Sequence, residues 1–121
     1  MNWFWLLVRP VRIGTVVGTA FHVKNLAVEV ILTTYNATRA LELCLAAVAD
    51  QDYPIASICV ADDGSGPETK ALVDAFAKSS PIAVRHVWHQ DDGFQKCAIL
   101  NKAIATSQAD FIVLIDGDVL I

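Results

Sequence analysis

Two aspartates separated by a single glycine, Asp116 and Asp118, come directly after the apolar run at residues 111–115. Carboxylate oxygens are ligands that Mg²⁺ and Mn²⁺ prefer, and phosphate oxygens of a substrate commonly complete the shell. Gly117 lets the backbone turn sharply between the two acids. The motif predicts a divalent-cation site that also binds a phosphorylated ligand, and a solvated turn is the alternative for such a motif on its own.

A second acidic pair, Asp62 and Asp63, follows another short apolar run. One carboxylate could accept hydrogen bonds from a base N–H or from ribose hydroxyls, whereas the alternative is an Asx turn that caps the next helix. We favour Asp63 facing the ligand and Asp62 bonding backbone. Thr34 and Tyr35, together with Thr33, could frame a base by stacking and hydrogen bonding, or could be ordinary strand-end residues.

The polar loop at residues 91–94 precedes a predicted helix at 95–106. Gly93 allows close backbone approach, and a helix N-terminus favours a phosphate group. Lys96 could add a positive point charge, although a solvated lysine is the alternative. The spacing of the three histidines gives no metal-ligand pattern, so we interpret them as non-ligands: His22, His86 and His89.

Alternating strand and helix patterns must position these clusters. Helical spacing places Leu41, Cys44, Leu45 and Val48 on one face, and Ser65 with Glu68 has the spacing of a capping box ahead of a second helix. The continuous apolar run at 111–115 is typical of a strand covered on both faces. The predicted strands are 28–33, 57–61, 83–88 and 111–115, and the predicted helices are 37–49, one starting near Pro67, and 95–106.

This β-α-β-α-β-α-β order predicts an α/β fold with a mostly parallel, Rossmann-like sheet and right-handed crossovers. In such sheets ligands bind outside the carboxyl ends of the strands. The polar clusters at residues 33–36, 62–65, 91–94 and 116–118 all fall at those ends. We therefore expect them to converge on one rim.

Five motifs in this order resemble the family-two glycosyltransferases of GT-A fold, the nucleotide-diphospho-sugar transferase type. The similarity covers residues 27–121, which we expect to be a partial GT-A domain, its N-terminal half. The motifs are VILTTYN at 30–36, QDYP at 51–54, VADDGSG at 60–66 with Thr69, DGF at 92–94 with LNKA at 100–103, and IDGD at 115–118.

The resemblance implies roles for particular residues. It places Thr34, Tyr35, Asp62 and Asp63 at the nucleoside, usually uridine, and Asp116 with Asp118 at the diphosphate and at a Mn²⁺ or Mg²⁺ ion. It implies inverting transfer of a sugar from a nucleotide diphosphate to the hydroxyl of an unknown acceptor, a glycan or a lipid-linked molecule, as in polysaccharide biosynthesis.

The family's catalytic base and acceptor segment lie beyond its Asp-x-Asp motif, so the base is unknown here. The alternative function is therefore a catalytically incomplete fragment that binds a nucleotide sugar without turnover. In the family, later strands extend the sheet, so we expect an open edge beside residues 111–115 and self-association through it.

Composition and motif order exclude some classes of partner and of protein. The net charge of −4 argues against a nucleic-acid partner. A phospho-receiver domain needs its acid pair after the first strand, and a nucleotidyltransferase needs a glycine-rich loop there, so both are disfavoured. Three cysteines, an odd number without metal-ligand spacing, favour a reduced, cytoplasmic setting: Cys44, Cys59 and Cys97.

The first 26 residues match nothing in the family, and we expect a poorly ordered extension. Their apolar run is interrupted by Arg9, Pro10 and Arg12, so it is too short to span a membrane. Aromatic residues followed by arginines could instead lie at a membrane surface. Residues 1–12 therefore predict a peripheral contact at the cytoplasmic face of a membrane.

Overall fold

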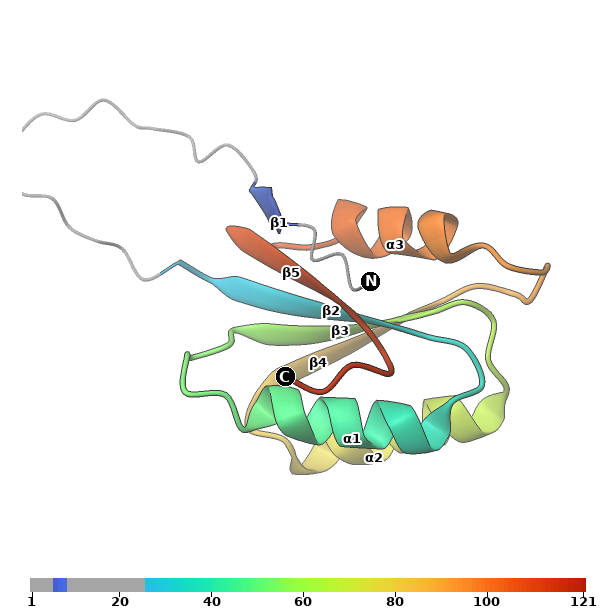
Figure 1. Cartoon of the computed structure of the whole chain (residues 1–121), viewed down its shortest axis with the longest axis horizontal. Coiled ribbons are helices and arrows are strands. Elements are labelled where there is room, and N and C mark those ends of the chain that lie inside the picture. The colour runs from blue at the N-terminus through green and yellow to red at the C-terminus, as the bar shows by residue number, and fades with distance from the viewer. Residues whose placement is uncertain (1–5, 9–25) are drawn as a thin grey trace, which may run out of the picture.

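The computed structural model describes residues 6–8 and 26–121 of the chain. In these residues a five-stranded sheet has the order β1-β5-β2-β3-β4, with helices on both faces (Figure 1). The four longer strands are parallel, and β1 is antiparallel to β5. The elements are β1 (Leu6–Val8), β2 (Val28–Thr34), α1 (Thr38–Ala49), β3 (Ser57–Asp62), α2 (Pro67–Ser79), β4 (Ala83–Trp88), α3 (Lys96–Ala105) and β5 (Phe111–Asp116).

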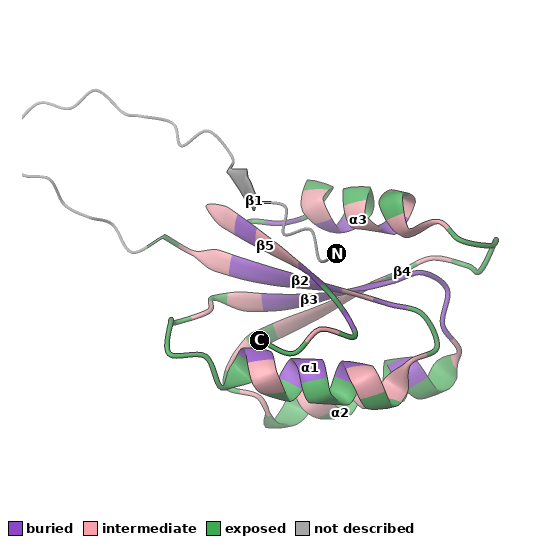
Figure 2. Ribbon diagram, in the orientation of Figure 1, coloured by how far each residue is buried: buried purple, intermediate pink, exposed green. Residues whose placement is uncertain are grey.

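Two hydrophobic layers lie on opposite faces of the sheet. Figure 1 shows α1 and α2 together on one face and α3 on the other. Because side chains alternate along a strand, Leu32 of β2 packs in the first layer and Ile31 in the second. Both are fully buried, and the burial is concentrated in the central strands and the inner helix faces (Figure 2). The four residues predicted for the inner face of α1 are all buried: Leu41, Cys44, Leu45 and Val48.

The strand register aligns the carboxyl ends of the central strands. Thr33 of β2 pairs with Asp116 of β5, and Thr34 pairs with Asp62 of β3. The two acidic motifs, which are separated by more than fifty residues in the sequence, therefore flank the end of one strand. The predicted convergence of polar loops on one rim follows directly from this register.

The N-terminus of α2 corrects one prediction. The N-cap residue is Gly66, and no side chain caps the helix. Ser65 does not form a capping box with Glu68, because its hydroxyl accepts a hydrogen bond from the backbone N–H of Asn36 at 2.8 Å. Pro67 occupies the first turn, as expected from its fixed backbone angle and missing N–H.

The sheet edge beside β5 also corrects an expectation. Residues 6–8 form β1, which pairs with Phe111–Val113 of β5, so this part of the edge is covered rather than open. We expected residues 1–26 to be poorly ordered, and of these only residues 6–8 and Leu26 are described. The expectation for the other positions lies outside the described residues. Among the described residues, no helix is long and apolar enough to cross a membrane.

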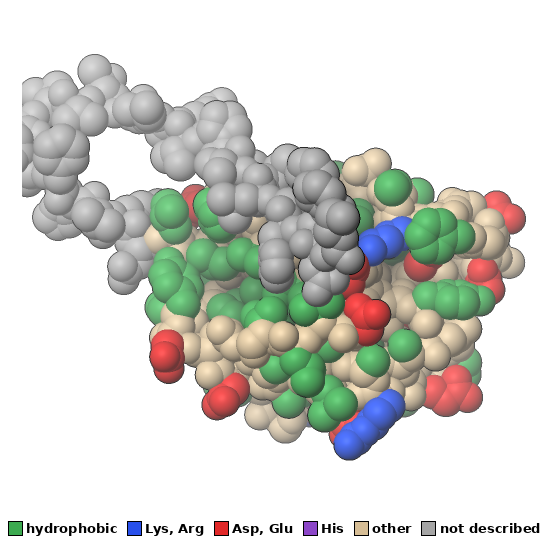
Figure 3. Space-filling model, in the orientation of Figure 1, with side chains coloured by type: hydrophobic (Ala, Val, Ile, Leu, Met, Phe, Trp, Pro, Cys, Tyr) green, Lys and Arg blue, Asp and Glu red, His purple; other side chains and the backbone are tan. Residues whose placement is uncertain are grey.

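Strand β5 is less covered than its apolar sequence predicts. Ile112 and Ile115 are buried, whereas Phe111, Val113 and Leu114 are only half-buried. Apolar side chains gather over β2 and β5 (Figure 3), where an apolar groove of about 400 Å³ lies between these strands and Tyr53. One face of β5 therefore lacks the full helical cover that the other central strands have.

An ion pair with a buried carboxylate joins β2 to β4, and its arginine also contacts α3. Glu29 of β2 is 2% exposed and accepts two hydrogen bonds from the Arg85 guanidinium, at 2.7 and 2.9 Å. Arg85 also donates to the Thr106 hydroxyl and to the Ala103 carbonyl at the end of α3. Burial raises the pKa of Glu29, but the hydrogen bonds from Arg85 and its neighbours outweigh it and hold the pKa below its ordinary value.

Candidate functional site

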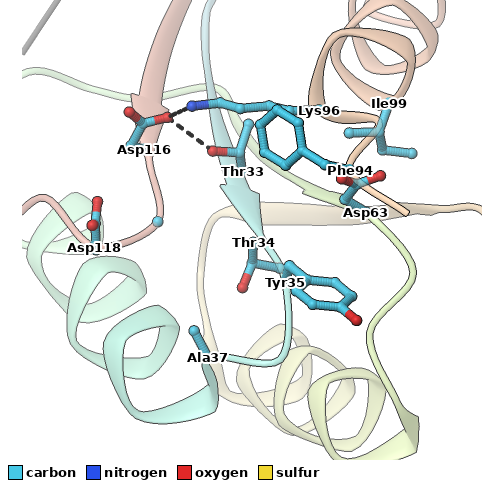
Figure 4. Close-up of a pocket in the computed structure, with 11 residues that line it drawn as sticks. Thr33, Thr34, Tyr35, Ala37, Asp63, Phe94, Lys96, Ile99, Asp116 and Asp118 are labelled. Atoms are coloured by element: carbon cyan, nitrogen blue, oxygen red, sulfur yellow. Dashed lines mark hydrogen bonds and ion pairs between the residues drawn. The ribbon is translucent and has the colours of Figure 1, made fainter. Parts of the chain in front are cut away.

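A pocket of about 280 Å³ lies at the carboxyl ends of β2, β3 and β5 and beside the N-terminus of α3 (Figure 4). Five of the six predicted site residues line it, and the sixth, Asp62, does not. Its lining residues are Thr33, Thr34, Tyr35, Ala37, Asp63, Phe94, Lys96, Ile99, Asp116, Gly117 and Asp118.

Asp116 is held by two neighbouring side chains. Its Oδ1 atom accepts a hydrogen bond from the Thr33 hydroxyl at 3.1 Å and forms an ion pair with the Lys96 ammonium. The hydrogen bond from Lys96 is the main reason that the pKa of Asp116 lies below its ordinary value; burial opposes the shift, and Thr33 adds to it. Asp116 is therefore an anion with a fixed orientation at neutral pH.

Gly117 makes the turn between the two acids possible. A Cβ atom at this position would lie 2.0 Å from the Thr33 carbonyl oxygen, so any other residue would push β5 away from β2. The backbone N–H of Val119 then donates to the Asp116 carbonyl at 3.0 Å and closes the turn. Asp118 lines the pocket and makes no hydrogen bond to the described residues. Its carboxylate is available to a ligand.

The two acids are a suitable donor set for Mg²⁺ or Mn²⁺ shared with a phosphorylated ligand. Among the described residues, no group of three or more His, Cys, Asp or Glu side chains could hold a metal ion by itself. Hard cations that keep several waters commonly use only one or two carboxylates, and substrate phosphates supply the remaining oxygens. The chemistry of Asp116 and Asp118 fits that pattern.

Asp63 reaches the pocket from the end of β3. One carboxylate oxygen lies 2.5 Å from His89 Nε2, and the other accepts the backbone N–H of Gln95 at 2.9 Å. Both contacts come from the segment just before α3. The sequence analysis predicted Asp63 as a site residue but missed His89, because two residues far apart in sequence give no signal of contact.

Asp62 points away from the pocket and is fully buried. It accepts the backbone N–H of Ser65 at 2.8 Å and contacts His86 Nε2 at 2.8 Å. Burial raises the pKa of Asp62, but the hydrogen bonds from His86 and Ser65 outweigh it, so the pKa lies below its ordinary value. The expected backbone bond is confirmed, whereas a contact between Asp62 and the nucleoside stays a prediction.

The end of β2 presents one aromatic ring and one buried hydroxyl. The Tyr35 hydroxyl donates to Asp91 at 2.9 Å, which raises the pKa of Tyr35 and ties the ring to the loop before α3. The ring itself is half exposed. The Thr34 hydroxyl oxygen is buried without a hydrogen-bond partner among the described residues. An unsatisfied buried hydroxyl costs about 1–3 kcal/mol, so Thr34 gains from any ligand that supplies a partner.

The loops that follow β2 and β3 are clasped to each other. Asn36 donates its backbone N–H to the Ser65 hydroxyl at 2.8 Å, and its side-chain oxygen accepts the backbone N–H of Gly66 at 2.9 Å. Asn36 has a φ angle of 45°, a left-handed conformation that asparagine tolerates better than most residues. This pair of hydrogen bonds, the Asn36 clasp, fixes the wall of the pocket that carries Tyr35 and Asp63.

The loop before α3 places an exposed aromatic ring at the pocket entrance. Phe94 is 87% exposed, although it lines the pocket. Gly93 precedes it with a φ angle of 76°, and its N–H donates to Asp91 at 3.2 Å. Figure 4 shows the Phe94 ring near Lys96 and Asp63. Sequence reasoning did not assign Phe94 to the site, although an aromatic residue in a polar loop was a usable signal.

The histidines do not assemble a metal centre among the described residues. His86 and His89 contact different carboxylates, Asp62 and Asp63, which face different ways from the end of β3. His22 lies outside the described residues. Each described histidine is instead in hydrogen-bonding contact with one carboxylate.

Comparison with known proteins identifies the family. Residues 29–121 match the family described as "Glycosyl transferase family 2", which is more than three quarters of the chain. The chain belongs to this family. Its parallel strands with flanking helices match the N-terminal part of the GT-A fold.

Similarity to individual proteins agrees with this assignment. The chain is 32% identical to a chondroitin synthase of Pasteurella multocida over 97 residues, which cover 78% of this chain and 10% of that protein. A mannosyltransferase, PcManGT, from Pyrobaculum calidifontis, solved with GDP-Man and Mn²⁺, superimposes with a TM-score of 0.69 and 27% identity over 81% of this chain and 29% of that one.

A third comparison is with TarS residues 1–349 from S. aureus in complex with UDP-GlcNAc. It has a TM-score of 0.61 and 25% identity, and covers 76% of this chain and 26% of that one. The chain therefore spans less than a third of the length of each of these proteins.

Proposed function

We propose that the chain supplies the donor site of a family-two glycosyltransferase and binds a UDP-linked sugar together with a divalent cation. The observation that carries this proposal is the pocket itself, where Tyr35, Asp63, Lys96, Asp116 and Asp118 meet at the carboxyl ends of parallel strands. A ring, hydrogen-bond acceptors and a cation-binding acid pair are the groups that a base, a ribose and a diphosphate require.

The nucleoside half of the pocket lies between β2 and β3. The half-exposed Tyr35 ring offers a stacking surface, and Asp63 offers a carboxylate that His89 and Gln95 hold in place. The orphaned Thr34 hydroxyl adds a group that a ligand can satisfy. One solved relative is in complex with GDP-Man and another with UDP-GlcNAc. The choice of uridine over guanosine for this chain is therefore part of the proposal.

The diphosphate half lies between β5 and α3. Asp116 and Asp118 would hold Mn²⁺ or Mg²⁺, and the bound cation would neutralise charge that develops on the departing diphosphate. Lys96 and the N-terminus of α3 add positive potential on the opposite side. This half of the site therefore suits a leaving group with two phosphates.

Transfer to an acceptor requires a base, which would take the proton of the acceptor hydroxyl in an inverting reaction. Among the described residues that line the pocket, Asp63 and Asp116 are already engaged by hydrogen bonds. Asp118 is the remaining carboxylate, and the proposal assigns it to the cation. The second candidate is that the chain binds the nucleotide sugar without turnover.

Titration calorimetry with UDP-GlcNAc tests the binding proposal. We expect tighter binding with Mn²⁺ than with a chelator, and we expect Asp118→Ala to remove the difference. Asp52→Ala is a matched control, because Asp52 is exposed in the loop before β3, at the opposite end of that strand. Equal affinity of the wild-type chain with and without Mn²⁺ would contradict the proposal.

An assay of sugar transfer separates the two candidates. If the chain only binds the donor, we expect nucleotide release limited to slow hydrolysis with any glycan or lipid-linked acceptor. General-base catalysis typically contributes a factor of about 10²–10⁴, and its loss should be measurable. Acceptor-dependent release at an enzyme-like rate would instead establish the chain as a complete transferase.

The cellular location is a separate proposal. We place the chain at the cytoplasmic face of a membrane, in peripheral contact through residues 1–12, because that segment combines tryptophans with arginines. Flotation with anionic lipid vesicles tests it, with a chain in which Trp3 and Trp5 are both replaced by Ala as the comparison. Equal recovery of the two chains in the floating fraction would contradict the membrane contact.

A further inference from the structure

We propose that Lys96 is an internal counter-ion of the cation site. Its ammonium pairs with Asp116 until a divalent cation displaces it, and it then contacts the diphosphate. The inference rests on the proposed function, because it names how one residue regulates the same site. It assigns Lys96 two opposite effects: it weakens the binding of a cation alone, and it strengthens the binding of the cation together with a nucleotide.

The contact that carries the inference joins α3 to β5. Lys96 is the first residue of α3, and its ammonium forms an ion pair with Asp116 Oδ1. The same oxygen also accepts a hydrogen bond from the Thr33 hydroxyl, so two donors already contact it. Lys96 is the only cationic side chain among the described residues that line the pocket. Figure 4 shows both dashed contacts converging on Asp116.

A divalent cation that coordinates Asp116 would compete with this ammonium for the carboxylate. The two positive groups would repel each other at such short range, so binding of the cation favours release of Lys96. The binding of Mn²⁺ alone therefore includes the cost of breaking the Lys96–Asp116 pair. With Lys96 removed, Asp116 and Asp118 would face the cation with no internal competitor.

A bound diphosphate changes the effect of Lys96 on cation affinity. Its negative charge gives the displaced ammonium a new partner at the same end of α3, where the helix N-terminus already favours phosphate. The Lys96 side chain is about one third exposed and has a flexible four-carbon stem, so it can move without disturbing the core. Lys96 would thus make the cation and the nucleotide bind cooperatively, and by linkage each raises the affinity of the other by the same factor.

The test is a binding cycle on the whole chain, with Mn²⁺ alone, UDP alone and both together. Electron paramagnetic resonance measures free Mn²⁺, and calorimetry measures UDP. For Lys96→Met we expect Mn²⁺ alone to bind roughly threefold to tenfold more tightly, the range set by the loss of a partly exposed charge pair and of the repulsion. UDP with saturating Mn²⁺ should bind more weakly by a similar factor.

Two variants complete the design. Lys102→Met removes the same charge from the last turn of α3, outside the pocket, and should shift each affinity by less than about twofold because screening weakens distant charges. Lys96→Gln provides a second test with a neutral polar side chain. Thermal unfolding of each variant verifies that the fold is intact.

The outcomes separate the inference from the proposed function. If Lys96→Met and Lys96→Gln bind Mn²⁺ alone no more tightly than the wild-type chain, the inference is overturned, even when UDP binds as proposed. If the wild-type chain shows no metal-dependent UDP binding, the proposed function fails, whereas the comparison with Mn²⁺ alone still tests the counter-ion. Opposite shifts for Mn²⁺ and UDP in the Lys96 variants, absent from Lys102→Met, support the inference.

Discussion

His89 Nε2 lies 2.5 Å from Asp63 Oδ1, while the backbone N–H of Gln95 donates to the other oxygen of the same carboxylate at 2.9 Å. The carboxylate is therefore fixed at both oxygens by the segment between β4 and α3. His89 does not line the pocket. Its place behind Asp63 makes it a positioning residue for that carboxylate.

Replacing His89 by Ala should loosen Asp63 and weaken UDP binding by roughly threefold to tenfold, the equivalent of about one hydrogen bond to a charged group. His89→Gln, which retains a side-chain donor, should restore part of the affinity. Calorimetry with UDP and Mn²⁺ measures both. Unchanged affinity in the alanine variant would mean that Asp63 is positioned by the backbone alone, or does not touch the nucleoside.

The neighbouring acids Asp62 and Asp63 should have different effects when each is changed to Asn. Asp62 is fully buried and bonded to Ser65 and His86, so Asp62→Asn should lower the free energy of unfolding by about 1–3 kcal/mol and leave UDP affinity nearly intact. Asp63→Asn should mainly weaken UDP binding. Denaturant unfolding and calorimetry separate the two effects. If both variants keep wild-type affinity, the loop is only a turn.

The buried Glu29–Arg85 pair should make stability depend on pH. Because the folded pKa of Glu29 is lowered, its contribution is fully present above its unfolded value, about 4.3–4.5, and is lost as the pH falls through the folded pKa. Glu29→Gln should cost about 3 kcal/mol at neutral pH, since it leaves the Arg85 charge unpaired, and should flatten stability in acid. Urea unfolding at several pH values measures both.

An exposed ion pair provides the control for that experiment. Lys70 and Asp74 are both at least half exposed on α2, so Lys70→Met should change the free energy of unfolding by less than about 1 kcal/mol. An equal loss in Glu29→Gln and Lys70→Met would contradict a special role for the buried pair.

Strand β1 should protect the chain from self-association. Removing residues 1–8 would uncover the backbone of Phe111–Val113, and an open strand edge beside apolar side chains pairs readily with another copy. Light scattering after size-exclusion chromatography should show a larger dimer or aggregate fraction than in the intact chain. Removing residues 1–5 alone should have a smaller effect. A monomer at all concentrations after loss of β1 would contradict this role.

The fold could be predicted because its signals are local. Alternating apolar runs and helical spacing are written in short windows of sequence, and they gave the strand and helix order with boundaries within about one or two residues of those observed. The convergence of the polar loops on one rim could also be predicted, since parallel strands bring their carboxyl ends to the same edge of the sheet. The pairing of β2 with β5, which brings Thr33 beside Asp116, was not predicted.

The features that sequence reasoning missed depend on contacts between distant segments. His89 and Asp63, or Ser65 and Asn36, are joined by hydrogen bonds that no spacing rule reveals. The capping box failed because Asn36 competes for the Ser65 hydroxyl. Strand β1 was missed because three residues within an unusual N-terminal segment carry too little pattern to define a strand.

The Asn36 clasp has a consequence for how this pocket can change over evolution. Since it links the turns after β2 and β3, the ring of Tyr35 and the carboxylate of Asp63 are mounted on one rigid wall. A wider pocket for a purine base cannot be made by shifting either turn alone. A switch of base preference should therefore require paired substitutions, one in each turn, and single substitutions at Asn36 should loosen selectivity without redirecting it.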